Sequence, residues 1–236
     1  MKITKKALLI LFTICIAIGS NAQEKWFSTF SDSNKLVKEA DGIVNKVHVD
    51  IKKINPDIIL PTTKVIKNTT PYLIYVDLEI HTINLPLWSE VIPEQKAFFA
   101  EVAGGDVLAK EVFGLFFNGF YLVHEYGHAF AESNGKRFDN AFDSEYEANS
   151  FAILYWRSIK KHKELKSCYN FAKSMLQKLK NPVPANEDYK AYMTAHYDEL
   201  SSDPYKYGYI QFSQFVEIYE KSNLGSFKTF VKNYKK

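Results

Sequence analysis

The chain has 236 residues, of which 46% are hydrophobic, and its formal net charge at pH 7 is +3. This length and apolar content suit a single globular domain with a sizeable core. The small net charge excludes a partner that is recruited by overall charge, such as nucleic acid or an anionic membrane surface.

Residues 1–22 have the pattern of a signal peptide. Lysines stand at positions 2, 5 and 6, an apolar run extends from Ala7 to Ile18, and small residues lead up to Ala22, after which we expect cleavage. The run covers 12 residues, counted from position 7 to position 18, whereas a membrane span needs about 20. An uncleaved anchor is therefore disfavoured, as is a lipoprotein in which Cys15 is modified, because Ile14 precedes it where a small residue is required. The sequence predicts export to the periplasm or secretion.

Removal of the signal peptide changes the charge and the cysteine content. Of the 30 basic residues three lie in residues 1–22, and none of the 27 acidic residues does, so the mature chain 23–236 carries 27 of each. Cys168 is then the single cysteine, which excludes an internal disulfide. We expect one domain over 23–236, with no nucleic acid partner and no stable membrane span.

The first elements of the mature chain are predicted to be a helix and a strand. Apolar residues recur at helical spacing from Asp32 to about Ile54, with Gly42 as a candidate interruption. Aromatic and branched residues from Leu73 to Ile80 alternate with acidic ones, which is typical of a strand. Pro86 ends this strand or confines it to a sheet edge.

A short helix around 95–102 is expected to lead into a long buried helix. Asp106 is its candidate N-cap and Asn134-Gly135 its expected end. Residues 112–123 are apolar almost all round, which indicates a helix inside the core. The apolar run is too short for a membrane span and is bracketed by charged residues.

The rest of the chain is predicted to be mostly helical. A polar connection over 136–143 precedes a helix from Glu145 to about Ile159. Further helices follow, with breaks at Pro182, Pro184 and Asp203-Pro204. The sequence therefore predicts an α+β protein that is mainly helical and has a small sheet.

The long helix carries the segment His124-Glu125-Tyr126-Gly127-His128. Residues four apart share a helix face, so His124 and His128 can present two imidazoles to one metal ion. Glu125 is turned about 100° further round the axis, where its carboxylate can act as a general base beside the metal. The alternative is that these are ordinary polar residues in a core, but three buried titratable groups need strong partners. Gly127, which is unfavourable inside a helix, indicates close packing at this point.

A catalytic zinc ion usually has three protein ligands. A third histidine six residues beyond His128 is excluded because position 134 is Asn134. Glu145, 17 residues after His128, is the favoured third ligand, and Asn149, four residues further on, can orient a ligating histidine from behind. Glu147 and Glu132 are interpreted as solvated or helix-pairing carboxylates.

The two motifs resemble those of the gluzincin metallopeptidases, the thermolysin-like group, and most of all those of the ImmA/IrrE-type peptidases. The resemblance is carried by His124 to His128 and by Glu145 to Ala152, and it covers about residues 118–157. It implies a zincin-like domain that binds Zn²⁺ and hydrolyses protein or peptide substrates, with Glu125 as the base. It also implies a tyrosine or histidine from the C-terminal part that stabilises the oxyanion. Four candidates stay open for that role: His196, Tyr205, Tyr207 and Tyr209.

In such enzymes a strand upstream of the metal helix receives the substrate in extended form. The predicted strand at 73–80 occupies that place in the chain order, while His81 at its end is interpreted as structural.

Two other classes of protein share parts of this pattern. One is a zinc-binding protein of the same fold without catalysis. The other is a helical bundle with two iron or manganese ions, which needs two Glu-x-x-His pairs. This chain has one such pair, Glu125 to His128, so the bundle is disfavoured.

Overall fold

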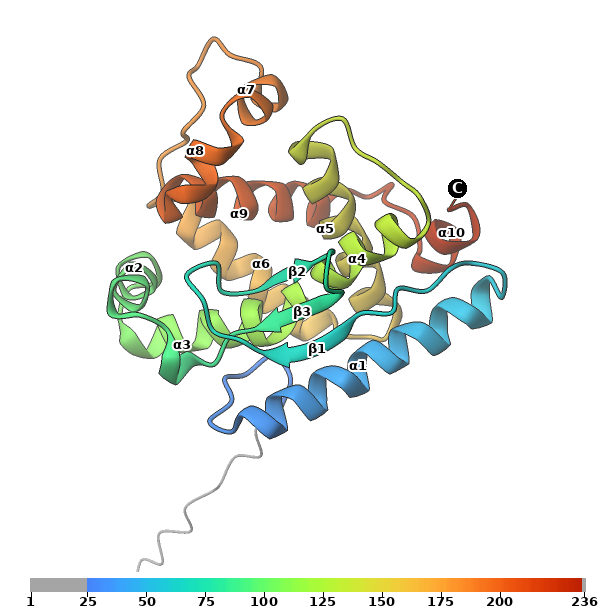
Figure 1. The fold of residues 1–236 in the computed structure, drawn as a ribbon. Coiled ribbons are helices and arrows are strands. Elements are labelled where there is room, and N and C mark those ends of the chain that lie inside the picture. The colour runs from blue at the N-terminus through green and yellow to red at the C-terminus, as the bar shows by residue number, and fades with distance from the viewer. Residues whose placement is uncertain (1–24, 235–236) are drawn as a thin grey trace, which may run out of the picture.

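The computed structural model describes residues 25–234, so the predicted signal peptide and its cleavage site lie outside the described residues. The fold is α+β and mainly helical, with one three-stranded sheet among the described residues, as the sequence predicts (Figure 1). No helix in the described part of the chain is long and apolar enough to cross a membrane.

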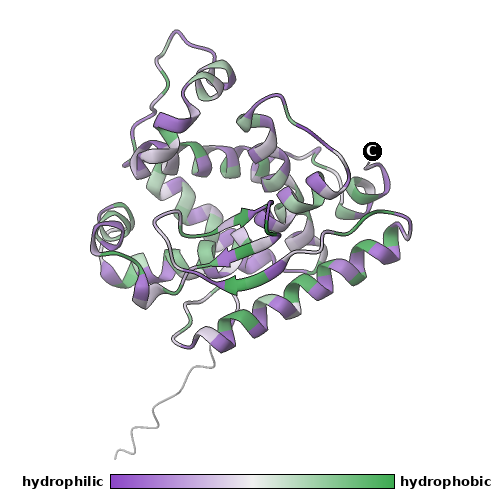
Figure 2. Ribbon diagram, viewed as in Figure 1, coloured by the Kyte–Doolittle hydropathy of each residue, from purple (hydrophilic) through white to green (hydrophobic). Residues whose placement is uncertain are grey.

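Helix α1 (Ser33–Ile54) begins at Asp32, whose side chain accepts a hydrogen bond from the Lys35 backbone N–H. It buries one apolar stripe and leaves the other face polar, which is visible as alternating colours along the helix (Figure 2). The helix continues through Gly42, so the interruption considered there does not occur. Gly42 lies on the exposed face with no neighbouring atom within 4 Å of a Cβ position, and its intrinsic cost of about 1 kcal/mol is small beside the burial of the opposite face.

The sheet consists of β1 (Lys64–Lys67), β2 (Tyr75–Asp77) and β3 (Thr82–Leu85). Its order is β1-β3-β2, with β1 parallel and β2 antiparallel to β3. The predicted strand at 73–80 is therefore wrong in extent. Asp77 Oδ1 accepts hydrogen bonds from the backbone N–H groups of Glu79 and Ile80, and this turn reverses the chain into β3, which ends immediately before Pro86.

Helix α2 (Pro93–Ala103) is followed by α3 (Asp106–Leu115), a π-helical turn (Phe116–Phe120) and α4 (Tyr121–Ser133). The expected single helix from Asp106 is thus divided, because Asn118 leaves helical geometry with φ −109° and ψ 30°. Gly105, and not Asp106, is its N-cap. The end at Asn134-Gly135 is as predicted, with Gly135 at φ 72°.

The remaining helices are α5 (Ala141–Ser158), α6 (His162–Leu176), α7 (Tyr189–Ala195), α8 (Tyr197–Ser202), α9 (Pro204–Glu220) and α10 (Phe227–Lys232), and a 3₁₀ turn spans Trp88–Glu90. Helix α5 begins at Ala141, earlier than predicted, because the Asn140 side chain caps it by accepting from the Asp143 N–H.

Helix α4, which carries His124 to His128, lies between the sheet and helix α5. Helix α4 contacts β2 and β3 on one side and α5 on the other, while α1 lies along β1 (Figure 1). Helices α4 and α5 approach closely at Gly127, where a Cβ atom would lie 3.2 Å from Ala148 Cα. This confirms the close packing that the glycine indicated, and it brings the motif His124–His128 against the first turns of α5.

Candidate metal centre

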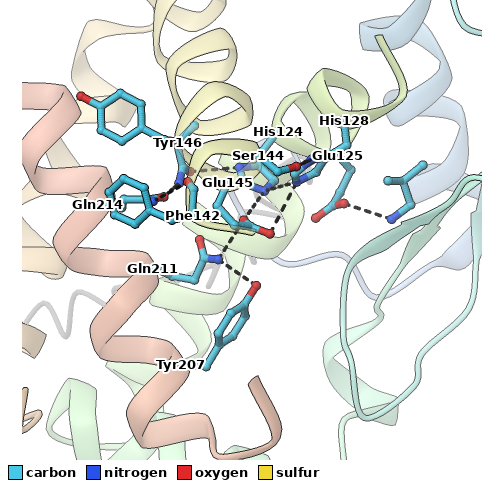
Figure 3. A network of polar contacts seen from close by, with 12 residues as sticks. His124, Glu125, His128, Phe142, Ser144, Glu145, Tyr146, Tyr207, Gln211 and Gln214 are labelled. Atoms are coloured by element: carbon cyan, nitrogen blue, oxygen red, sulfur yellow. Dashed lines mark hydrogen bonds and ion pairs between the residues drawn. The ribbon is translucent and has the colours of Figure 1, made fainter. Parts of the chain in front are cut away.

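Three side chains from α4 and α5 converge at the contact between these helices. The Nε2 atoms of His124 and His128 lie 3.1 Å apart. Glu145 Oε2 is 3.2 Å from His124 Nε2, and its Oε1 is 3.7 Å from His128 Nε2 (Figure 3). Within residues 25–234 these three form the one group of histidine, cysteine and acidic side chains that can hold a metal ion. The structure thus brings together the two histidines and the glutamate that the sequence predicts as metal ligands.

A chain of hydrogen bonds determines which nitrogen of His124 faces the site. Gln214 Nε2 donates to the Phe142 carbonyl oxygen at 3.1 Å, and Asn149 Nδ2 donates to Gln214 Oε1 at 3.0 Å. Asn149 Oδ1 therefore points at His124 Nδ1, 3.0 Å away. Because an amide oxygen can only accept, Nδ1 carries a proton, and Nε2 is the nitrogen that faces Glu145. Asn149 thus lies where the sequence predicts a residue that orients a ligand.

The other two members of the group are held in a similar way. Ser144 Oγ lies 3.2 Å from His128 Nδ1. Gln211 Nε2 donates to Glu145 Oε2 at 2.9 Å, and the Tyr197 hydroxyl donates to Oε1 at 3.5 Å. Hydrogen bonds of this kind fix the orientation of metal ligands in proteins.

The charges of these groups follow from burial and from their mutual contacts. Burial lowers the pKa of His128 to about 4, although the Glu145 carboxylate opposes this shift. Burial alone would raise the pKa of Glu145, but the hydrogen bond with His124 and the charges of both imidazoles outweigh it and lower the pKa to about 2. Burial acts to lower the pKa of His124 as well, but the hydrogen bond with Glu145 and the charges of Glu145 and Glu125 outweigh it and raise this pKa. Carboxylates bind metal in the ionised form and histidines as the neutral imidazole, so a metal ion at this site competes with a proton on His124.

Glu125 lies beside the three converging side chains, on the side that faces the sheet. Its Oε2 accepts a hydrogen bond of 3.0 Å from the backbone N–H of Val76 in β2 (Figure 3). Burial, reinforced by the charge of Glu145, raises the pKa of Glu125 to about 7, against the lowering effects of His124 and the Val76 N–H. A carboxyl group with this pKa can both take up and release a proton near neutral pH.

Of the four oxyanion candidates from the C-terminal part, the structure places Tyr207 at the site. Its hydroxyl accepts from Gln211 Nε2 at 2.8 Å. The Tyr205 hydroxyl instead donates to Glu101 at 2.6 Å, and His196 is 45% exposed and faces Glu199. Tyr209 packs against the main hydrophobic core.

Several residues at the site were not found from the sequence. Tyr197, Gln211 and Gln214 come from α8 and α9, and Gln211 contacts a residue 66 positions earlier in the chain. Of these residues only Ser144 could have been suspected from the sequence, because it directly precedes the predicted ligand Glu145. The carboxylates interpreted as helix-pairing lie elsewhere, since Glu147 accepts from Lys136 and Tyr234 and Glu132 pairs with Arg137.

The relay behind His124 leads to a testable expectation. Asn149→Ala removes the acceptor for His124 Nδ1 and is expected to weaken zinc affinity by about 10- to 100-fold, the usual effect of losing such a partner. Asn149→Asp keeps an acceptor oxygen and should lose less affinity. Competition titration with a chromogenic chelator measures both, and equal affinities for Asn149→Ala and the unmodified protein would contradict the role of Asn149.

Taken together, a buried carboxylate and two oriented imidazoles can hold a metal ion at this place, with a further carboxyl group beside them. The chain matches no protein-family model, and comparisons with curated proteins and with solved structures give no significant match.

Proposed function

We propose that the protein is a zinc-dependent peptidase with a zincin-like fold. The observation that carries this proposal is the spacing of the three converging ligand atoms. Zinc bonds to nitrogen and oxygen of about 2.0–2.2 Å in tetrahedral geometry place neighbouring ligand atoms about 3.3 Å apart. The Nε2 atoms of His124 and His128 lie 3.1 Å apart, and the Glu145 carboxylate approaches them through its two oxygens, Oε2 at 3.2 Å from His124 and Oε1 at 3.7 Å from His128. One donor atom from each residue lies within 4.8 Å of the other two, so the carboxylate is within reach of an ion held between the two imidazoles.

The chemistry of the donor set favours zinc among the metals. Two imidazoles suit zinc and other transition metals, whereas magnesium and calcium prefer sites made of oxygen atoms. Two histidines and one glutamate leave a fourth position for water, as in catalytic zinc sites. A bound zinc ion would act as a Lewis acid toward that water and toward a substrate carbonyl.

The residues around the site have separate parts in the proposed hydrolysis. Glu125 takes a proton from the attacking water and passes it to the departing amine, while the Val76 N–H holds its carboxylate in place. The hydroxyls of Tyr197 and Tyr207 lie on the other side, close to Glu145 and Gln211. Burial raises the pKa of Tyr197 to about 12, so this hydroxyl keeps its proton at neutral pH and can donate to a developing negative charge.

The position of β2 supports a peptide as the substrate. It is an edge strand of the sheet, and the N–H of Val76 points away from β3 toward Glu125. An extended peptide can add to such an edge through main-chain hydrogen bonds, which aligns a peptide carbonyl with the metal site. With residues 1–22 acting as a signal peptide, this activity belongs to the periplasm or the cell exterior.

Metal removal tests the proposal. The purified full chain is expected to contain one zinc ion per molecule, to cleave casein or a peptide library, to lose cleavage after treatment with a strong chelator and to regain it when Zn²⁺ is added. Elemental analysis and mass spectrometry of the products measure these outcomes.

Each contrary result points to a different class. Absence of stoichiometric metal would contradict the site itself. Zinc without cleavage under any condition would favour a non-catalytic zinc-binding protein of the same fold, and two iron or manganese ions per chain would favour the di-metal class.

A further inference from the structure

The helix that carries His124 is preceded directly by a distorted turn. In the π-helical turn Phe116–Phe120 the N–H of Tyr121 donates to the Phe116 carbonyl, five residues back. Such a turn holds one residue more than an α-helical turn and therefore releases carbonyl groups from the regular hydrogen-bond ladder. Released carbonyl groups in a protein core need other donors.

Residues 25–30, here called the N-terminal strap, supply two such donors, while Trp156 Nε1 in α5 donates to the Phe120 carbonyl at 3.3 Å. The backbone N–H of Phe27 donates to the Asn118 carbonyl at 2.8 Å, and Trp26 Nε1 donates to the Gly119 carbonyl at 2.9 Å. Both aromatic side chains are buried, and the Phe27 ring packs edge-on against Trp156 with centroids 4.8 Å apart. The strap is therefore bound to the two residues at the centre of the distortion.

Glycines at two positions make room for the strap. A Cβ atom on Gly119 would lie 2.6 Å from Phe27 Cδ1, and one on Gly114 would lie 2.7 Å from the Thr29 nitrogen. Phe27 itself has φ 71°, a conformation that costs on the order of 1–2 kcal/mol for a residue with a side chain. The close fit at both glycines and the strained backbone at Phe27 indicate that the contact between the strap and the π-helical turn determines the geometry of the turn.

The geometry of the turn decides where the metal ligands point. One extra residue rotates everything that follows by about 100° relative to an uninterrupted α-helix. His124 and His128 follow the turn directly, so their direction relative to α3 depends on whether the turn persists. We infer that the N-terminal strap is the positioning element of the metal centre, and that Trp26 and Phe27 set the rotation of α4 by holding the π-helical turn open. This inference rests on the proposed metal site.

The test compares metal binding by two strap variants with that of a core variant. Trp26→Phe keeps a ring but removes the Nε1 donor to Gly119, and Gly119→Ala places a methyl group against Phe27. Val231→Ala, which truncates a fully buried side chain in α10, serves as a control for general loss of stability. Each full-length variant is titrated with Co²⁺ and with Zn²⁺ well below its melting temperature, and the visible absorption of bound Co²⁺ reports the ligand geometry.

We expect Trp26→Phe to weaken Co²⁺ and Zn²⁺ affinity by about tenfold and Gly119→Ala by about 100-fold, the range seen when ligand orientation is disturbed, with an altered Co²⁺ spectrum in both. Val231→Ala should have a lower melting temperature but the same metal affinity and the same Co²⁺ spectrum as the unmodified protein.

Unchanged affinity and spectrum in Trp26→Phe would overturn the inference, and this variant decides the matter if Gly119→Ala does not fold. A loss of affinity in Val231→Ala equal to that in Trp26→Phe would overturn it as well, because the effect would then be one of stability alone. Failure of the unmodified protein to bind either metal is a separate result and would contradict the metal centre itself.

Discussion

Replacing Glu125 by glutamine is expected to lower kcat/KM for peptide cleavage by about 10³-fold or more while the bound metal is retained. A general base contributes about 10²- to 10⁴-fold to a rate, and glutamine cannot accept the proton of the attacking water. Its amide oxygen can still accept the hydrogen bond from the Val76 N–H, and the three converging ligand atoms belong to other residues. Peptide cleavage assays and elemental analysis of the same preparation measure the two quantities.

Glu132→Gln is the matched control for this substitution. Glu132 lies in the same helix but pairs with Arg137, away from the metal centre, so cleavage by this variant should equal that of the unmodified protein. Wild-type cleavage by Glu125→Gln would contradict the assignment of the base. Loss of metal in Glu125→Gln would show that this carboxylate is itself a ligand.

Replacing Glu145 by glutamine is expected to weaken zinc affinity by more than about 100-fold, because loss of a ligand costs more than loss of a partner behind a ligand. The change removes the one negative charge that faces both histidine Nε2 atoms, at 3.2 and 3.7 Å. It also leaves Gln211 facing a neutral amide in place of a carboxylate. Zinc competition titration measures the affinity, and cleavage at sub-stoichiometric zinc should fall in parallel.

Glu147→Gln separates the two glutamates of this motif. Glu147 lies two residues further along α5, and its contacts are with Lys136 and Tyr234. Its substitution should leave zinc affinity unchanged and should lower thermal stability modestly, as expected for a partly exposed ion pair. If Glu147→Gln loses zinc and Glu145→Gln does not, the third ligand has been assigned to the wrong residue.

Features that depend on neighbouring residues were predictable without the fold. The burial of one face of α1 follows from apolar residues at helical spacing, and the shared face of His124 and His128 follows from their separation of four. Gly127 indicated close packing, and Ala148 is found there. The first two features arise within a few turns of one helix, so their pattern is visible in nearby residues, whereas the glycine indicated that something packs closely at this point but not that its neighbour is Ala148 of α5.

Features that depend on contacts between distant segments were missed or mistaken. The segment predicted as one strand at 73–80 contains only β2 and the turn that leads to β3, because the Asp77 side chain accepts hydrogen bonds from the backbone N–H groups that a longer strand would use. The helix predicted to run from Asp106 was divided at Asn118, where the N-terminal strap supplies the missing hydrogen bonds.

The sequence by itself determined the donor types of the candidate metal centre and the spacing of His124, Glu125 and His128, because a single helix sets their relative directions. Tertiary structure alone decided the rest of the site. Packing of α4 on α5 brings Glu145 to the histidines, and α8 and α9 add Tyr197, Gln211 and Gln214. These side chains meet because helices that are far apart in the chain pack around one hydrophobic core. Hydrophobic burial is non-directional, so no pattern in nearby residues predicts which distant side chains will come into contact.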